Sequence, residues 1–150
     1  PGESKQFTYK ALHAEVCKFA NVLKRNGIKK GDVVTFYLPM IPELAIGILA
    51  CTRIGAIHAV VFCGFSADAL ASRIQDCESV MVVSCDGTFR GAKAIPQKAN
   101  ADKAIQACPT IQTHLVVERV GDKVKVDWND RTDKWYHDEY AAVGSDCPPE

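Results

Sequence analysis

The sequence has no excess of charge of either sign and no long apolar run. Its 150 residues hold 18 lysines and arginines against 18 aspartates and glutamates. Because these charges balance, we expect no general attraction to nucleic acid or to an anionic membrane, so any anion site would have to be local. No apolar run reaches the length of a membrane-spanning helix, and the first residues lack the apolar region of a signal peptide. These absences argue against nucleic acid and membranes as partners.

Paired cysteine motifs are also absent. The chain has seven cysteines but no CxxC pair, and most of them stand beside apolar residues, as Cys51 and Cys85 do. Cysteines in such surroundings are usually small buried hydrophobes. A reducing, intracellular compartment is therefore favoured over a disulfide framework, and no Cys or His pair has the short spacing typical of a metal site.

The sequence lacks an initiator methionine, and it ends in Cys147-Pro148-Pro149-Glu150 without an obvious helix stop. Its length suits one domain or one large subdomain. We expect both ends to be cut from a longer polypeptide, and the alternative is a small natural protein with a processed start.

Helical and strand patterns alternate along the chain. The predicted helices lie between Thr8 and Gly27 and at residues 43–54, 66–75 and 96–107. The predicted strands lie at residues 33–38, 58–62, 79–85 and 114–120, and a hairpin turn at Gly121-Asp122 is predicted to lead into a half-exposed strand at 123–128, with a short helix within 133–143. This order predicts an α/β fold with a mostly parallel sheet flanked by helices. Ligands of such sheets bind at the carboxyl ends of the strands, which are here the loops after Phe62 and Cys85.

The first of these loops runs directly from a strand into a helix. Phe62 and Phe65 offer flat apolar surfaces on which a heterocyclic base could stack. Gly64 between them allows a close approach or an unusual dihedral angle, and the helix that starts at Ser66 could present its amides to an anion. The alternative is a tight turn with both phenylalanines in the core.

The second loop, residues 86–93, is glycine-rich and basic. Arg90 can hold a phosphate with two parallel hydrogen bonds, and Lys93 adds a point charge. The loop does not match a P-loop, because Gly87 and Gly91 are four residues apart rather than five and Lys93 is followed by alanine rather than by serine or threonine. No side chain is therefore placed to hold magnesium as that motif requires. The loop is interpreted as an anion site for a terminal phosphate, and the alternative is a solvated basic loop.

Longer strings spread along the chain carry a more specific signal than either loop. They are Phe7-Thr8-Tyr9-Lys10-Ala11-Leu12, Tyr37-Leu38-Pro39-Met40-Ile41-Pro42-Glu43, Ala50-Cys51-Thr52-Arg53-Ile54-Gly55-Ala56-Ile57-His58, Phe65-Ser66-Ala67-Asp68-Ala69-Leu70, Arg90-Gly91-Ala92-Lys93-Ala94-Ile95-Pro96 and Trp135-Tyr136-His137-Asp138. Together they resemble the adenylate-forming (AMP-binding) enzymes and, more narrowly, the acetyl-CoA synthetase branch. The match covers essentially the whole chain in one order.

The resemblance implies a parent enzyme that joins acetate to CoA in two steps. Acetate attacks the α-phosphate of ATP in the presence of magnesium and gives acetyl-AMP and pyrophosphate, and the thiol of CoA then attacks the acyl carbon and releases AMP. The implied partners are acetate, ATP, CoA and the remainder of the same polypeptide, and the implied location is cytoplasmic, or nuclear. Residues 1–150 would be the first subdomain of the large N-terminal domain, without its phosphate loop, its acyl pocket or the C-terminal domain.

The resemblance also implies which residues contact CoA. The family's strand-to-helix turn falls at Phe62, Cys63 and Gly64, and its basic pair near the 3′-phosphate of CoA falls at Arg90 and Lys93. Cys63 stands where a glycine is usual, and Lys93 stands where some relatives carry arginine, which keeps the charge but loses the bidentate fork. No catalytic and no metal-binding residue is assigned to this chain. The alternatives are another short-chain ligase, such as a propionyl-CoA synthetase, and a stand-alone phosphate- or nucleotide-binding module.

Overall fold

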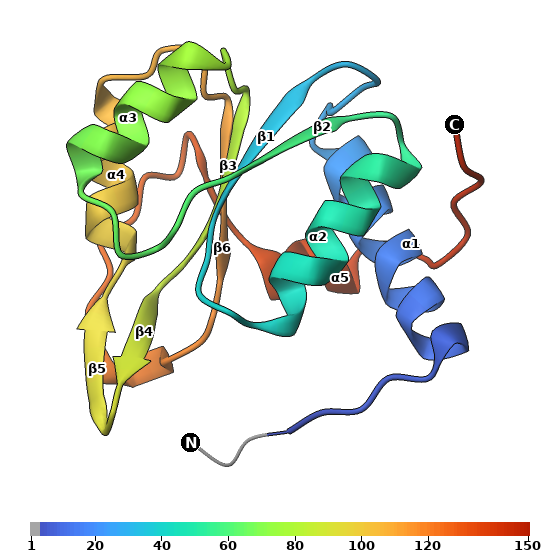
Figure 1. The fold of residues 1–150 in the computed structure, drawn as a ribbon, viewed down its shortest axis with the longest axis horizontal. Helices are drawn as coiled ribbons and strands as arrows, with labels where there is room; N and C mark the ends of the chain where they lie inside the picture. The colour runs from blue at the N-terminus through green and yellow to red at the C-terminus, as the bar shows by residue number, and fades with distance from the viewer. Residues whose placement is uncertain (1–3) are drawn as a thin grey trace.

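A computed structural model describes residues 4–150 of the chain. The start of the sequence, where the initiator methionine is missing, lies outside the described residues. Five parallel strands form the central sheet in the order β2-β1-β3-β6-β7 (Figure 1). They are β1 (Val33–Tyr37), β2 (Ile57–Val60), β3 (Met81–Cys85), β6 (Thr113–Val117) and β7 (Asp133–Trp135). All their pairings are parallel, which confirms the predicted α/β fold with a mostly parallel sheet flanked by helices.

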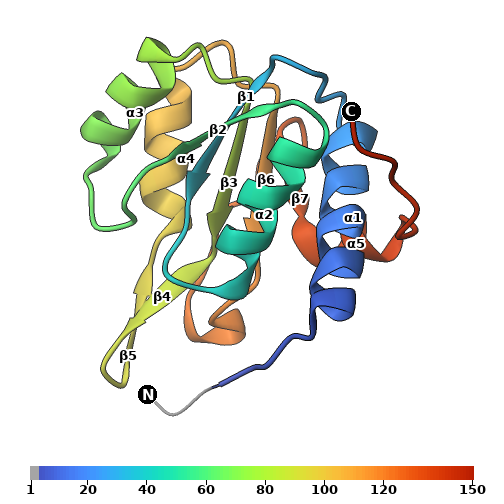
Figure 2. The same ribbon diagram turned by 45° about the vertical axis from the view of Figure 1, so that its right-hand side comes forward.

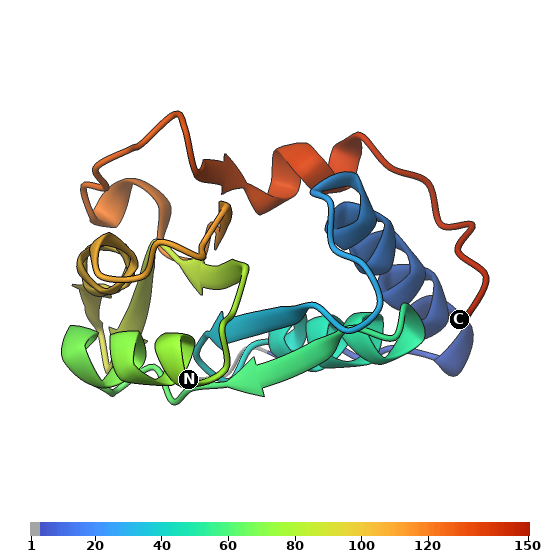
Figure 3. The same ribbon diagram turned by 90° about the horizontal axis from the view of Figure 1, so that it is seen from above.

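Helices cover both faces of this sheet. On one face lie α1 (Tyr9–Arg25), α2 (Pro42–Arg53) and α5 (Tyr136–Ala141), and on the other lie α3 (Ala67–Asp76) and α4 (Lys98–Gln106). Figures 1 and 3 show the two helix groups on opposite sides of the strands. Each face has its own apolar core, because alternate side chains of a strand point to opposite sides. The central strands β1, β3 and β6 are therefore buried on both faces, whereas β2 at the edge of the sheet is largely exposed.

Local sequence signals account for the helix boundaries. The Thr8 hydroxyl accepts a hydrogen bond from the amide of Ala11 at 3.1 Å, and the Ser66 hydroxyl accepts one from Ala69 at 3.2 Å. Both are side-chain N-caps, which satisfy amides that the first helical turn leaves without partners. Gly27, with φ +84°, follows α1 in the left-handed conformation that ends helices.

The cysteines behave as the sequence predicts for small buried hydrophobes. All seven are free, and five of them are buried. Burial raises the pKa of the Cys51 and Cys85 thiols to about 12, so both are protonated at neutral pH.

Two predicted segments differ in the structure. Residues 86–93, expected to be a loop, form most of an antiparallel hairpin of β4 (Gly87–Arg90) and β5 (Lys93–Pro96), and the following helix begins at Lys98. The hairpin predicted around Gly121-Asp122 is wrong, because a short 3-10 helix, η1 (Gly121–Lys123), takes its place. The next strand is β7, which joins the main sheet in parallel beside β6.

A buried carboxylate explains why the chain curls at η1. Asp86, at the end of β3, accepts hydrogen bonds from the amides of Arg119, Val120 and Gly121 at 2.8 to 3.2 Å. These amides are consequently bound to a side chain and cannot pair with a neighbouring strand. A hairpin at Gly121-Asp122 would need these backbone amides to donate to the carbonyls of a paired strand. Because they donate to Asp86 instead, the hairpin does not form.

Candidate functional site

The two predicted loops leave the sheet at the same edge. Strands β2 and β3 run parallel to each other on either side of β1, so their carboxyl ends point the same way. The turn after β2, residues 61–66, and the hairpin after β3 therefore both lie at the carboxyl-end edge. Figure 2 shows the hairpin projecting beyond this edge. Sheets of this kind bind ligands there.

The turn after β2 presents two aromatic rings to solvent. Phe62 is 66% exposed and Phe65 is 37% exposed, and their ring centroids lie 6.0 Å apart in an edge-to-face arrangement. The alternative of a tight turn with both rings in the core is therefore wrong. The exposed part of the Phe62 ring is the apolar surface that the sequence predicts for stacking on a planar ligand.

Gly64 lies directly beneath the ring of Phe62. Its backbone is not in the left-handed region, but a β-carbon at this position would lie 2.5 Å from Cε1 of Phe62. The Phe62 ring thus lies directly against the Gly64 backbone. The unusual dihedral angle that the sequence allowed at Gly64 is not the left-handed one, and the close approach of a ligand there stays a prediction.

Two buried side chains donate hydrogen bonds to backbone carbonyls of the turn. The Tyr37 hydroxyl donates to the carbonyl of Phe65 at 2.6 Å, and the Gln97 side-chain amide donates to the carbonyl of Cys63 at 2.6 Å. Tyr37 and Gln97 are 0% and 3% exposed. Burial raises the pKa of the Tyr37 hydroxyl, which keeps its proton available as a donor. The turn is thus attached both to β1 and to the segment between β5 and α4.

The tip of the hairpin carries the predicted basic pair. Arg90 and Lys93 are cross-strand partners, and both are exposed. Gly91 between them has φ +61°, the left-handed conformation that two-residue hairpin turns need and that glycine adopts without strain. Directly opposed residues of a hairpin share a face, so the guanidinium and the ammonium lie on one side of it. Such a pair suits a dianionic group such as a phosphate monoester.

The opposite face of the hairpin is packed rather than free. Phe89 alternates with Arg90 and points the other way, where the Arg119 guanidinium lies 5.4 Å and the Lys123 ammonium 4.9 Å from its ring centroid. At the base, Asp86 bonds the amide of Gly87 at 2.7 Å as well as those of residues 119–121. The hairpin is therefore braced on one face and open on the face with Arg90 and Lys93.

The connection between the turn and the basic tip is indirect. Within residues 4–150, no hydrogen bond or ion pair joins Arg90 or Lys93 to the turn, and the link runs through Gln97 at the end of β5. Lys93 and Ile95 alternate along β5 and so share a side of the hairpin, whereas Gln97 lies beyond the strand as the N-cap of α4. Gln97 therefore links the turn to the segment that directly follows the hairpin.

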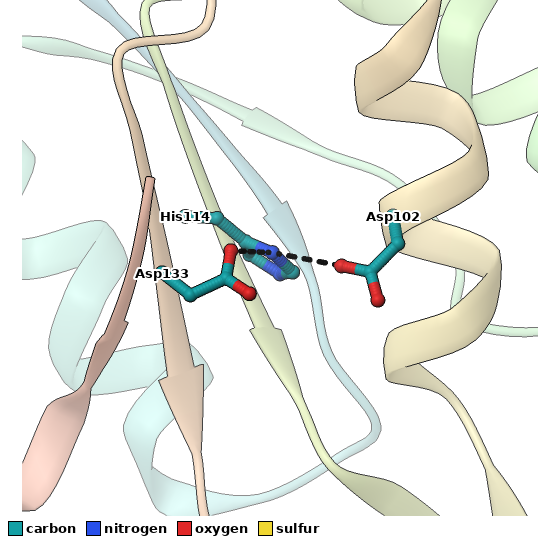
Figure 4. Close-up of side chains that lie close together, drawn as sticks. All are labelled: Asp102, His114 and Asp133. Carbon is teal, nitrogen blue, oxygen red and sulfur yellow. Dashed lines mark ion pairs between the residues drawn. The ribbon is translucent and has the colours of Figure 1, made fainter. Parts of the chain in front are cut away.

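A second polar cluster was not predicted from the sequence. The Lys98 ammonium, whose side chain is 2% exposed, lies 2.7 Å from Oδ2 of Asp133 and 2.8 Å from Oδ1 of Asp102. His114 faces the same carboxylates through Nδ1, at 3.3 Å from Asp133 and 3.4 Å from Asp102 (Figure 4), and its Nε2 lies 2.6 Å from the hydroxyl of Ser84. The spacing of Lys98 and Asp102, four residues apart on a helix, was a signal for one of these pairs. The contribution of Asp133, 35 residues beyond Lys98, had no local signal.

Lys98, Asp102 and Asp133 of this cluster line a cavity of about 520 Å³ together with Trp128. Asp102, His114 and Asp133 offer ligand atoms within 4.8 Å of one another, which is compatible with a metal ion. However, the Lys98 ammonium already bonds both carboxylates, so the chain supplies the cation itself. Burial opposes ionisation of Asp133, but the imidazole of His114 close by and the hydrogen bonds from Lys98 and a backbone amide outweigh it and hold the pKa of this carboxyl well below its usual range. The cluster is a buried ion-pair network between α4, β6 and β7.

Among the helices of residues 4–150, none combines the length and the hydropathy that crossing a bilayer needs.

The fold and the site define an α/β protein with an aromatic turn and a basic hairpin at the carboxyl-end edge of its sheet. The sequence model of the AMP-binding enzyme family matches residues 2–148. The chain therefore belongs to the AMP-binding enzyme family, as its resemblance to adenylate-forming enzymes predicted.

Individual relatives agree with this assignment. The chain is 52% identical to acetyl-coenzyme A synthetase 2 of Pseudomonas putida and 53% identical to the acetyl-coenzyme A synthetase of Mesorhizobium japonicum, over 100% of its own length and 23% of theirs. Its fold matches that of an acetoacetyl-CoA synthetase from Streptomyces lividans with a TM-score of 0.86, at 23% identity, over 99% of this chain and 22% of that one. The chain thus spans about a quarter of the length of these relatives.

Proposed function

We propose that this chain is part of an acetate–CoA ligase (AMP-forming), in which it forms the first part of the large N-terminal domain and contributes one wall of the CoA site. The whole protein would convert acetate, ATP and CoA to acetyl-CoA, AMP and pyrophosphate through acetyl-AMP. The proposal rests on identities of 52% and 53% to acetyl-coenzyme A synthetases across the chain's whole length. A propionate-activating ligase is the nearest alternative, and a stand-alone binding module is less favoured because the relatives are about four times longer.

The observation that carries the CoA assignment is the pairing of an exposed aromatic turn with an exposed basic hairpin at one sheet edge. CoA ends in an adenosine that bears a 3′-phosphate, so it needs a surface for stacking and a cationic group near by. Phe62 provides the surface, and Arg90 with Lys93 provides the charge. The backbone at Cys63 and Gly64 would border the pantetheine arm.

The rest of the reaction depends on groups outside this chain. ATP, magnesium and acetate would be bound by the remainder of the polypeptide, and we assign no catalytic residue to residues 1–150. A cytoplasmic location fits a ligase that uses ATP and CoA, and it agrees with the seven free cysteines.

Replacing Arg90 tests this proposal. In the complete ligase, Arg90→Ala is expected to raise the KM for CoA about tenfold or more, because one charge-assisted hydrogen bond contributes about 1.5–3 kcal/mol. The KM for 3′-dephospho-CoA should change much less, since that substrate lacks the phosphate. Thioester formation would be measured with both substrates at saturating acetate and ATP.

The matched control is Arg131→Ala, which removes an exposed arginine from the loop before β7, away from this edge. It should leave both KM values unchanged. If Arg90→Ala weakened CoA and 3′-dephospho-CoA equally, or neither of them, the hairpin would have no part in recognising the 3′-phosphate.

A further inference from the structure

Gln97 lies between the two parts of the proposed CoA site. Its side-chain amide donates to the carbonyl of Cys63 at 2.6 Å, and its own amide donates to the carbonyl of Asp86 at 3.0 Å. Asp86 is the residue that braces the base of the hairpin. One buried residue therefore connects the aromatic turn to the base of the hairpin whose tip carries Arg90.

The hydrogen bond from Gln97 reaches the middle of the aromatic turn. Cys63 stands between Phe62, the exposed ring, and Gly64, across which that ring folds. A hydrogen bond to the Cys63 carbonyl fixes the plane of the Cys63–Gly64 peptide, and the Phe62 ring lies against Gly64. Tyr37 holds the same turn two residues later, through the carbonyl of Phe65.

We infer that Gln97 is a positioning residue for CoA, which holds the stacking turn and the phosphate-binding hairpin at a fixed separation. This inference rests on the proposed function, because it presumes that CoA spans both parts. Gln97 itself is buried and touches the backbone of the turn rather than any ligand. Its effect on CoA binding arises because a ligand held at two points binds best when those points are already in place.

The test is the replacement Gln97→Met in the complete ligase, which keeps the length of the side chain and removes its hydrogen-bond donor. The KM for CoA is expected to rise about tenfold, while acetate-dependent ATP–pyrophosphate exchange, which does not use CoA, falls less than twofold. Tyr37→Phe removes the second attachment of the turn without a loss of packing, and it should raise the KM for CoA in the same direction.

A matched control exists on the neighbouring helix pair. Gln75 also donates from its side-chain amide to a backbone carbonyl, that of Ala107, at 2.8 Å, and it ties α3 to the end of α4 away from the turn. Gln75→Met should leave the KM for CoA unchanged. If Gln97→Met lowered exchange and thioester formation together, or if it matched Gln75→Met, Gln97 would be a residue of general structural importance and the inference would be wrong.

A double-mutant cycle separates this inference from the proposed function. If Gln97 sets the separation of the two anchors, its replacement should matter less once one anchor is gone, so in the Arg90→Ala background the KM for CoA should rise only about threefold or less. Additive effects of Gln97→Met and Arg90→Ala would overturn the coupling. A normal KM for CoA in Arg90→Ala alone would overturn the proposed site, whereas a raised KM there with a normal one in Gln97→Met would overturn only the role of Gln97.

Discussion

Asp133 is a single residue whose ionisation depends on its burial and its partners. Its carboxylate accepts from the Lys98 ammonium at 2.7 Å and from the amide of Asn129 at 2.8 Å, and it faces His114. Its pKa in the folded chain is lowered from the usual value, because these partners outweigh the effect of burial. A carboxyl whose pKa is lowered by folding contributes stability above its unfolded pKa of about 4, and this stability is lost as the pH falls toward the folded pKa.

Asp133→Asn is therefore expected to change both the size and the pH dependence of stability. At pH 7 the free energy of unfolding should fall by about 2–3 kcal/mol, because Lys98 loses one of its two carboxylate partners while buried. Between pH 5 and pH 3 the variant should lose less further stability than the unchanged protein does. Urea unfolding followed by tryptophan fluorescence measures both effects, since Trp128 lies 5.3 Å from the Lys98 ammonium.

Asp130→Asn, in the exposed part of the same loop, is the control and should leave the stability and its acid dependence unchanged. An Asp133→Asn protein with the same loss of stability between pH 5 and pH 3 as the unchanged protein would show that this carboxylate does not carry the dependence.

At the scale of one element, the β4–β5 hairpin depends on the absence of a side chain at its base. A β-carbon at Gly87 would lie 2.8 Å from the carbonyl oxygen of Ile95 and 2.7 Å from a methyl group of Val120. The valine can rotate, but the carbonyl belongs to the paired strand and cannot move without breaking the ladder. The hairpin and the segment after β6 consequently approach each other more closely than any other residue at position 87 would allow.

Gly87→Ala is expected to destabilise the protein by about 2 kcal/mol, as overpacking of a close contact does. It should also raise the KM for CoA several-fold, because the hairpin that carries Arg90 would shift. Gly144→Ala is the comparison, since a β-carbon there meets nothing within 4 Å and its backbone is outside the left-handed region. Equal thermal stability and equal KM values in the two variants would mean that the hairpin base tolerates a side chain.

At the scale of the whole molecule, the chain is a doubly wound sheet with an exposed aromatic turn and an exposed basic pair at its carboxyl-end edge. The buried carboxylate cluster is neutralised internally, because Asp102 and Asp133 both pair with Lys98. The chain accounts for 23% of the length of its acetyl-coenzyme A synthetase relatives. Adenylation is therefore expected to need the rest of the polypeptide.

The 150-residue chain by itself is expected to show no acetate-dependent ATP–pyrophosphate exchange. Labelled pyrophosphate would be incubated with ATP, acetate, magnesium and the purified chain, with the complete ligase as the positive control. Incorporation of label into ATP that requires acetate, scales with the amount of chain and disappears on heating would contradict the expectation and place adenylating groups within these residues.

Much of the fold and part of the site could be predicted from neighbouring residues. Caps such as Thr8 and Ser66, and apolar residues at helical or strand spacing, act within a few positions of each other, so they determine the alternating helices and strands and hence the parallel sheet. The order of the strands along the chain then places the turn at Phe62 and the segment with Arg90 at one edge. These features can be predicted from the sequence because the helices and strands depend on residues close together in the chain. The edge at which the two segments lie then follows from the order in which strands and helices alternate.

Other features were decided only when distant segments came together. The sequence predicts a loop where the β4–β5 hairpin forms. The base of this hairpin is held by hydrogen bonds that Asp86 accepts from backbone amides more than 30 residues away. The same hydrogen bonds favour η1 over the hairpin predicted at Gly121-Asp122. The partner of Lys98 in β7, Asp133, lies 35 residues further along the chain. Strand pairing and buried ion pairs depend on which partner is near in space, and only the tertiary structure determines that.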